Sequence, residues 1–143
     1  MRGVRVPYRV DVIASRAKTA LRRYALAFPD AWEDHPWGED VAKVGKKVFV
    51  FFGRPPDMAL MVGVKLPASL LYARSRPFTV PFGYGMDRHG WVAAHFKATD
   101  DVPMDLMKEW IAESYEAIAP KPKTPKAKPA RKPNARERRA PAS

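Results

Sequence analysis

The sequence predicts one α+β domain over residues 10–119, in which an antiparallel sheet is covered on one face by an N-terminal and a C-terminal helix. Three observations lead to this prediction. Apolar residues recur at helical spacing near both ends of the range. Short apolar or alternating runs, separated by Gly and Pro, lie between those two stretches, as the strands of a meander would. At 143 residues, the chain has room for a single domain with one modest core.

The first helix is expected over residues 12–28, before Pro29, which stops it. Asp11 can cap this helix, because an Asp side chain accepts hydrogen bonds from the free amides of a first helical turn. The basic residues fall largely off the apolar stripe, so they form either a solvated face or a surface that contacts DNA. The stripe consists of Ile13, Ala17, Ala20, Leu21, Tyr24 and Phe28.

Residues 31–40 are expected to form a loop that is anchored by its two tryptophans. Glu33, Asp34 and His35 could suggest a metal site or acid–base chemistry. Contiguous side chains diverge in most loop conformations, however, and no second cluster of ligands completes a shell. We therefore predict no metal site, and we expect a solvated acidic group that repels phosphate.

Three strands are expected next, over residues 41–44, 48–52 and 58–64. Strict alternation along the second of them places Phe49 and Phe51 on one face and its other residues on the opposite face. Both faces are then apolar, which is typical of a central strand.

Four basic residues stand beside these strands or shortly after them. Lys46 and Lys47 occupy the first turn, where they suit phosphate contact at the tip of a wing, or simply keep a hairpin turn in solution. Arg74 and Arg76 add positive charge just before a glycine-rich segment.

That segment, residues 81–91, contains three glycines and presents Arg88 and His89 just before Trp91. Glycine permits positive φ and a close approach of the backbone, so the segment is expected to be a shaped loop. It is either a binding site or a turn whose aromatic residues fill the core.

The remaining elements are a short helix over residues 68–73, strands over 78–80 and 91–96, and a final helix that starts at residues 100–103 and ends before Pro120. The stripe of the final helix is expected to lie in the core. It consists of Leu106, Met107, Trp110, Ile111, Ser114, Tyr115 and Ile118.

Composition excludes several classes of protein. The chain has no cysteine, so it has no disulfide, thiol nucleophile or Cys-ligated zinc. No apolar run approaches the roughly 18 residues of a membrane span. Residues 1–9, an N-terminal extension, lack the apolar core of a secretory signal. A cytoplasmic protein is expected.

Most of the net charge of +11 belongs to a C-terminal tail, residues 120–143. The tail has nine Lys or Arg and one Glu, a net charge of +8, which leaves +3 for the first 119 residues. It has no large apolar residue, so we expect it to be disordered. It either binds polyanions by counterion release or is a solubilising extension.

Three motifs resemble those of the MmcQ/YjbR family over roughly residues 12–119. Gly-Tyr-Gly-Met-Asp-Arg-His-Gly-Trp at residues 83–91 is similar to a family segment that leads into a strand. Phe-Pro-Asp-Ala-Trp-Glu at 28–33, with Pro-Trp-Gly at 36–38, resembles a second motif, and Ser-Tyr at 114–115 resembles a third. The resemblance implies a CyaY-like "double-wing" fold and DNA binding.

We predict a DNA-binding protein without enzymatic activity that contacts mainly phosphates. The mild charge of the first 119 residues and the acidic loop argue against this function, and no helix has an obvious base-reading face. The candidate contacts are Lys46, Lys47, Arg74, Arg76, Arg88 and His89, with Lys121, Lys123, Lys126, Lys128, Arg131 and Lys132 in the tail.

The alternative is an adaptor domain that binds a protein or a small molecule, with the tail as a nonspecific tether. Its candidate surface is the acidic loop with Trp32 and Trp37. The basic first helix argues against CyaY-like iron binding. Three histidines with no nucleophile–base pattern give no support for an enzyme, and Gly83 and Gly85 lack P-loop or Rossmann spacing. No cofactor is expected.

Overall fold

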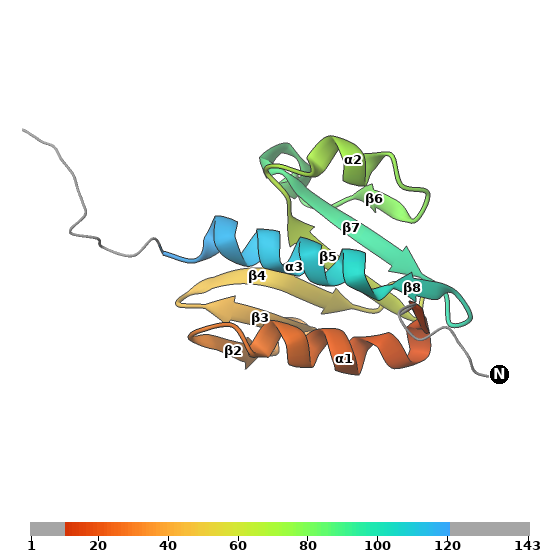
Figure 1. The fold of residues 1–143 in the computed structure, drawn as a ribbon, viewed down its shortest axis with the longest axis horizontal. Coiled ribbons are helices and arrows are strands. Elements are labelled where there is room, and N and C mark those ends of the chain that lie inside the picture. The colour runs from red at the N-terminus through yellow and green to blue at the C-terminus, as the bar shows by residue number, and fades with distance from the viewer. Residues whose placement is uncertain (1–10, 121–143) are drawn as a thin grey trace, which may run out of the picture.

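A six-stranded antiparallel sheet lies at the centre of the fold, and two long helices cover one of its faces (Figure 1). The computed structural model describes residues 11–120. The helices are α1 (Ala14–Leu26) and α3 (Met104–Ile118). In spatial order, the strands are β2 (Ala31–Asp34), β3 (Asp40–Val44), β4 (Lys47–Gly53), β5 (Leu60–Lys65), β7 (Trp91–Phe96) and β6 (Thr79–Pro81). The predicted α+β fold is confirmed.

A second sheet of two short strands changes where α1 begins. β1 (Asp11–Ile13) pairs antiparallel with β8 (Asp101–Pro103). This pairing holds residues 11–13 extended, so α1 begins at Ala14 and not at residue 12. The predicted Asp11 cap is wrong, because the capping position is Ile13, which makes no side-chain capping hydrogen bond.

The buried faces of the long helices agree largely with the predicted stripes. Leu21 and Trp110 are buried, for example, but Ile13 is 46% exposed and Ala20 is also exposed. Ile13 belongs to β1, and Ala20 lies about 100° around the helix from Leu21, at the edge of the stripe. The buried face of α1 is formed by Ala14, Ala17, Leu21 and Ala25.

The segment predicted as a loop is the edge strand β2 followed by a 3₁₀ helix, η2 (Pro36–Gly38). β2 pairs antiparallel with β3, which satisfies backbone groups that a loop would leave to water. The loop prediction for residues 31–40 is therefore wrong.

A β-bulge in β4 overrides the predicted alternation of that strand. The register moves from Ala42 opposite Val50 to Lys43 opposite Val48, so Phe49 has no partner on β3. A bulge residue turns toward the face of its neighbour. Phe49 therefore packs in the core with Val50, under the helices, and Phe51 faces the other side.

Ser114 of α3 satisfies backbone groups at this bulge. Its buried hydroxyl donates to the carbonyl of Phe49 at 2.6 Å and accepts from the amide of Lys65 at 2.9 Å. The next residue, Tyr115, stacks on Phe28 at 4.6 Å between ring centroids and donates its hydroxyl to the carbonyl of Pro29 at 2.7 Å. The Ser-Tyr pair thus fastens α3 to the sheet and to the chain that follows α1.

The face of the sheet opposite the helices carries a small apolar cluster that holds the glycine-rich segment. Phe82 packs there with Met61, Trp91 and Phe51. Gly63 makes this possible, because a Cβ at Gly63 would lie 2.2 Å from the Phe82 ring. The segment is therefore anchored to the sheet by its first aromatic residue.

The shorter predicted elements are present with small shifts. The helix predicted over residues 68–73 is α2 (Leu70–Arg74), and the strand predicted over 78–80 is β6. A 3₁₀ helix, η3 (Met86–His89), lies inside the glycine-rich segment. β7 has its predicted bounds. None of the described helices has the length and hydropathy that a membrane crossing requires.

Candidate functional site

The end of α2 and the glycine-rich segment lie side by side and form one exposed surface. The side chain of Arg74 links them, because its Nη2 donates to the carbonyl of Asp87 at 3.0 Å. We call this the α2–η3 surface. It comprises Leu71, Tyr72, Arg74, Arg76, Tyr84, Arg88 and His89, all of them exposed except the half-buried Arg76.

Arg76 is held against α2 by an aromatic contact. Its guanidinium lies over the ring of Tyr72, 4.7 Å from the centroid. Its Nε is buried and has no hydrogen-bond partner among the described residues. Its carbonyl accepts from the hydroxyl and the amide of Thr79, which fixes the backbone between α2 and β6.

The backbone around η3 follows from its glycines. Gly85 and Gly90 flank η3 with φ of 74° and 88°, a left-handed conformation that favours glycine. Between them, Arg88 and His89 point to solvent. The predicted turn with aromatic residues in the core is confirmed for Phe82 and Trp91, which fill an apolar cluster. The binding site stays a prediction, and its basic side chains are exposed.

Charge is unevenly distributed along the described chain. Residues 58–99 carry five Lys or Arg and one acid, Asp87, a net charge of +4. Residues 100–120 carry one Lys and six acids, a net charge of −5. Within residues 11–120, none of Arg74, Arg76 and Arg88 belongs to an ion pair. The α2–η3 surface therefore carries an excess of positive charge, with Asp87 as the one carboxylate of residues 58–99.

One carboxylate does contact α2, at the opposite end from Arg74. Glu113 of α3 accepts hydrogen bonds from the amides of Ala68 and Ser69 and from the Ser69 hydroxyl. These bonds cap the start of α2 and fix it against α3.

Lys46 and Lys47 lie at the same end of the sheet as η3 but on a separate hairpin (Figure 1). The antiparallel registers place the β3–β4 turn, the end of β5 and the start of β7 at this end. β5 stands between β4 and β7, so the lysines form a second positive group. Both lysines are exposed. The predicted tail contacts, from Lys121 to Lys132, and the N-terminal extension lie outside the described residues.

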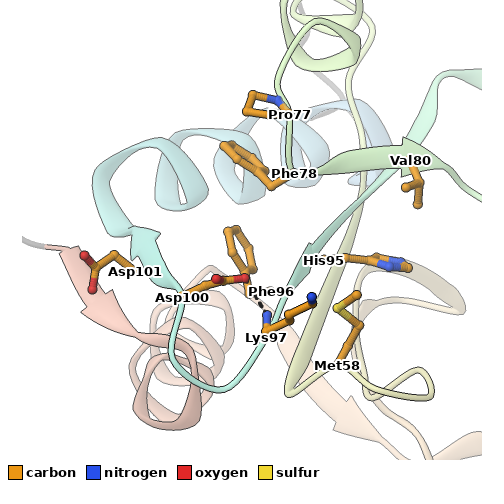
Figure 2. A pocket seen from close by; sticks show the side chains of 9 residues that line it. All are labelled: Met58, Pro77, Phe78, Val80, His95, Phe96, Lys97, Asp100 and Asp101. Carbon is orange, nitrogen blue, oxygen red and sulfur yellow. Dashed lines mark hydrogen bonds between the residues drawn. The ribbon is translucent and has the colours of Figure 1, made fainter.

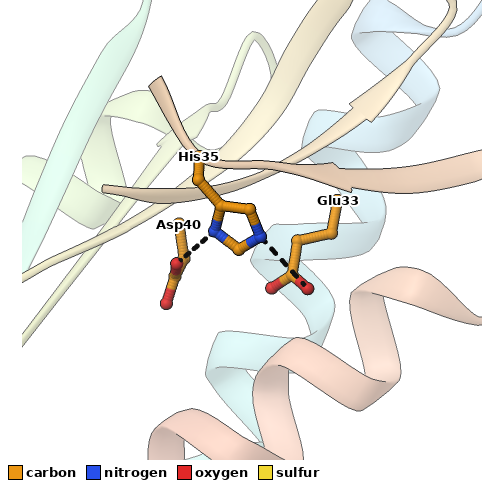
Figure 3. A group of neighbouring side chains, drawn as sticks. All are labelled: Glu33, His35 and Asp40. Atoms are coloured by element: carbon orange, nitrogen blue, oxygen red, sulfur yellow. Dashed lines mark hydrogen bonds and ion pairs between the residues drawn. The ribbon is translucent and has the colours of Figure 1, made fainter. Parts of the chain in front are cut away.

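Glu33, His35 and Asp40 converge at the edge of the sheet beside α1 (Figure 3). The ring of His35 lies between the carboxylates, with Nδ1 2.7 Å from Asp40 and Nε2 3.8 Å from Glu33. Sequence reasoning expected divergence, but Glu33 and His35 are two residues apart at the end of a strand. The available signal was this spacing, which places alternate residues on one face.

Cations of α1 already occupy this cluster. Lys18 pairs with Asp40 at 2.5 Å, and Arg22 pairs with Glu33. The hydrogen bond from Arg22 holds the pKa of Glu33 below its ordinary value, and the bond from Lys18 does the same for Asp40. A metal ion could bind only by displacing both cations. Glu33 and Asp40 are therefore not the solvated acids that the sequence predicted, and these two basic residues of α1 serve an ion-pair network. The predicted repulsion of phosphate stays a prediction.

Acid should weaken this network. Because the pKa values of Glu33 and Asp40 are lowered in the folded state, their contribution to stability is present above the ordinary carboxyl pKa and is lost as the pH falls through the folded value. The free energy of unfolding, measured in urea, is expected to fall between about pH 7 and 3. Glu33→Gln should reduce this fall by about 1 kcal/mol or less, because the ion pair of Glu33 is partly exposed to solvent. The exposed Glu109→Gln serves as the control. Identical pH curves for Glu33→Gln and the native chain would contradict this prediction.

An open pocket of about 440 Å³ lies where β6 and β7 meet the turn before β8 (Figure 2). Its walls are largely apolar, and burial lowers the pKa of His95, which favours the neutral imidazole. The amide of Lys97 donates to Asp100 at 2.6 Å on its rim. Sequence reasoning missed this pocket, for which a histidine within an apolar strand was the available signal. The lining residues are Met58, Pro77, Phe78, Val80, His95, Phe96, Lys97, Asp100 and Asp101.

Comparison with protein-family models matches residues 26–117 to the family described as YjbR. The match includes α2, η3 and every strand of the six-stranded sheet. No curated protein matches the chain.

Proposed function

The chain belongs to the YjbR family, and from this membership and the unpaired arginines of the α2–η3 surface we propose that it binds nucleic acid through phosphate contacts, without enzymatic activity. The observation that carries the proposal is the group of three arginines without a carboxylate partner among the described residues. Such a group is available to bind an external anion. The cytoplasm, where nucleic acid is accessible, is the location we propose with this function.

Arginine suits this role, because its planar guanidinium can donate two parallel hydrogen bonds to a phosphate. Arg74 and Arg76 are held in place by the Asp87 carbonyl and the Tyr72 ring. The side chain of Arg88 is exposed and makes no hydrogen bond or ion pair with a described residue, so it is the side chain most available to a phosphate. The acidic residues of 100–120 would turn α3 away from the nucleic acid, which orients the domain.

Arg88→Ala is expected to weaken binding of a duplex of about 20 base pairs and to lower the slope of log K against log salt by about 1, because one phosphate contact is lost. Fluorescence anisotropy at several salt concentrations measures both quantities. The melting temperature should not change, because the Arg88 side chain is exposed.

Arg54→Ala is the matched control. Arg54 is an exposed arginine directly after β4, at the end of the sheet opposite η3. Equal affinities and equal salt slopes for the two variants would show that Arg88 makes no phosphate contact. A chain that ends at Ala119, measured in parallel, shows directly how much binding the tail supplies.

A second candidate function, small-molecule binding, is favoured by the pocket around His95, where apolar walls meet an imidazole and an ammonium group. The alternative of a protein partner at the tryptophans of residues 31–40 has less support. Trp32 is only 44% exposed, its Nε1 donates to the carbonyl of Gly45, and Lys43 lies over its ring. Unchanged DNA binding in Arg88→Ala would favour the small-molecule function.

A further inference from the structure

We propose that the α2–η3 surface selects single-stranded nucleic acid, with unpaired bases stacking on Tyr84 and Tyr72 while the arginines hold the backbone. This inference rests on the proposed function and names its ligand.

Exposed aromatic and aliphatic side chains gather on this surface. Tyr84 is fully exposed, Leu71 is 83% exposed and Tyr72 is 52% exposed, and these are the three most exposed large hydrophobic residues of the described chain. Apolar side chains that remain in water at adjacent positions commonly mark a binding site.

Tyr84 is also held in an unfavourable backbone conformation. Its φ of 61° lies in the left-handed region, which is an outlier for a bulky residue. Among residues 11–120, its ring has no hydrogen bond and no aromatic partner. The fold therefore exposes the Tyr84 ring at the tip of a turn. The strained backbone costs free energy, and packing of the ring does not compensate for it. Strain of this kind is typical of functional positions.

The ring of Tyr72 is held in position by a neighbouring side chain. Arg76 lies over Tyr72 and limits the motion of its ring, while half of the side chain stays open. The hydrogen bond from Arg74 to Asp87 fixes α2, with Tyr72, against η3, which follows Tyr84. The two tyrosine rings thus lie on neighbouring elements, and arginines lie between them in the sequence. Proteins that bind single-stranded nucleic acid combine aromatic rings, on which bases stack, with basic residues in this way.

The charge of the chain argues for an external anion on this surface. Residues 1–10 carry three arginines and no acid, and residues 121–143 carry nine Lys or Arg and one Glu. Neither end of the chain complements a surface with three unpaired arginines. A polyanion with planar bases offers both the phosphates for the arginines and the rings for the tyrosines. A duplex offers its phosphates but no base faces for stacking, since these are stacked inside the helix.

The test compares oligo(dT) of about 12 nucleotides with a duplex of about 20 base pairs, both titrated with the full chain. Anisotropy is measured at about 0.2 and 0.4 M salt, where purely electrostatic binding weakens and stacking persists. Tyr84→Ala removes the ring, and Tyr84→Phe keeps it. Ile13→Ala is the control, because Ile13 is an exposed apolar residue of the separate two-stranded sheet.

We expect Tyr84→Ala to weaken oligo(dT) binding about 5- to 150-fold and to change duplex binding less than about 2-fold. Tyr84→Phe and Ile13→Ala should stay within about 2-fold of the native affinity for both ligands. The melting temperature of each variant establishes that it is folded.

Equal losses for both ligands in Tyr84→Ala, or unchanged oligo(dT) binding, would overturn the inference. If Arg88→Ala weakens duplex binding while Tyr84→Ala changes neither ligand, the proposed function stands and base stacking fails. If neither variant changes either affinity, both proposals fail. Preferential binding of an acidic peptide over oligo(dT) would likewise overturn the inference in favour of a protein partner.

Discussion

Trp110→Ala is expected to lower the free energy of unfolding by about 3–5 kcal/mol, the range for truncating a large aromatic residue in a core. Trp110 is only 2% exposed, and its ring packs 6.1 Å from that of Phe78 between centroids. α3 contacts β4 and β5 through this buried face, so the cavity would open between the helix and the sheet. Urea unfolding followed by circular dichroism measures the change.

The neighbouring Glu109→Ala provides the control, because Glu109 is exposed on the same helix turn and should change stability by about 0.5 kcal/mol or less. A loss below about 1 kcal/mol for Trp110→Ala would contradict the burial of this face of α3. Helical propensity cannot account for a loss in either variant, since alanine favours the helix more than Trp or Glu does.

Periodicity was sufficient to predict β7 and most of α3, because each buries one or both faces in a regular pattern along its own length. The predicted start of α3 at residues 100–103 is wrong, because residues 101–103 form β8 and the helix begins at Met104. It failed where a distant partner decides the conformation. Residues 11–13 carry no pattern that separates a strand from a first helical turn, and their extended form depends on pairing with residues 101–103. The edge strand β2 was missed for the same reason, since its partner β3 follows a proline and a glycine.

The candidate site was predicted in part. Local composition pointed to Arg88 and His89, because glycines surround them, and to the two arginines that precede the segment. The structure adds the hydrogen bond from Arg74 to the carbonyl of Asp87, which no spacing indicates. The exposure of Tyr84 could not be predicted. Its neighbour in the same segment, Phe82, is buried, and only the fold distinguishes the two rings.

Ser114→Ala is expected to cost about 2–4 kcal/mol, far more than the loss of one hydroxyl from a surface. The bulge at Phe49 removes that residue from the ladder with β3, and Ser114 supplies a donor to its carbonyl. The same hydroxyl accepts from the amide of Lys65. Without it, two backbone groups lose their partner in the interior, and each buried group left unpaired costs about 1–3 kcal/mol. Urea unfolding measures the total.

Ser75→Ala is the matched control, because the Ser75 hydroxyl also donates to a backbone carbonyl, that of Tyr72 at 2.6 Å, but in an exposed position where water can replace it. The control should therefore lose about 0.5 kcal/mol or less. Equal losses for the two variants would mean that water reaches the bulge, and that Ser114 does not stabilise it. A large loss of stability confined to Ser114→Ala would explain why a serine precedes the tyrosine of α3. A small hydroxyl at this helix position reaches the carbonyl of Phe49, which the β-bulge in β4 leaves without a partner on β3.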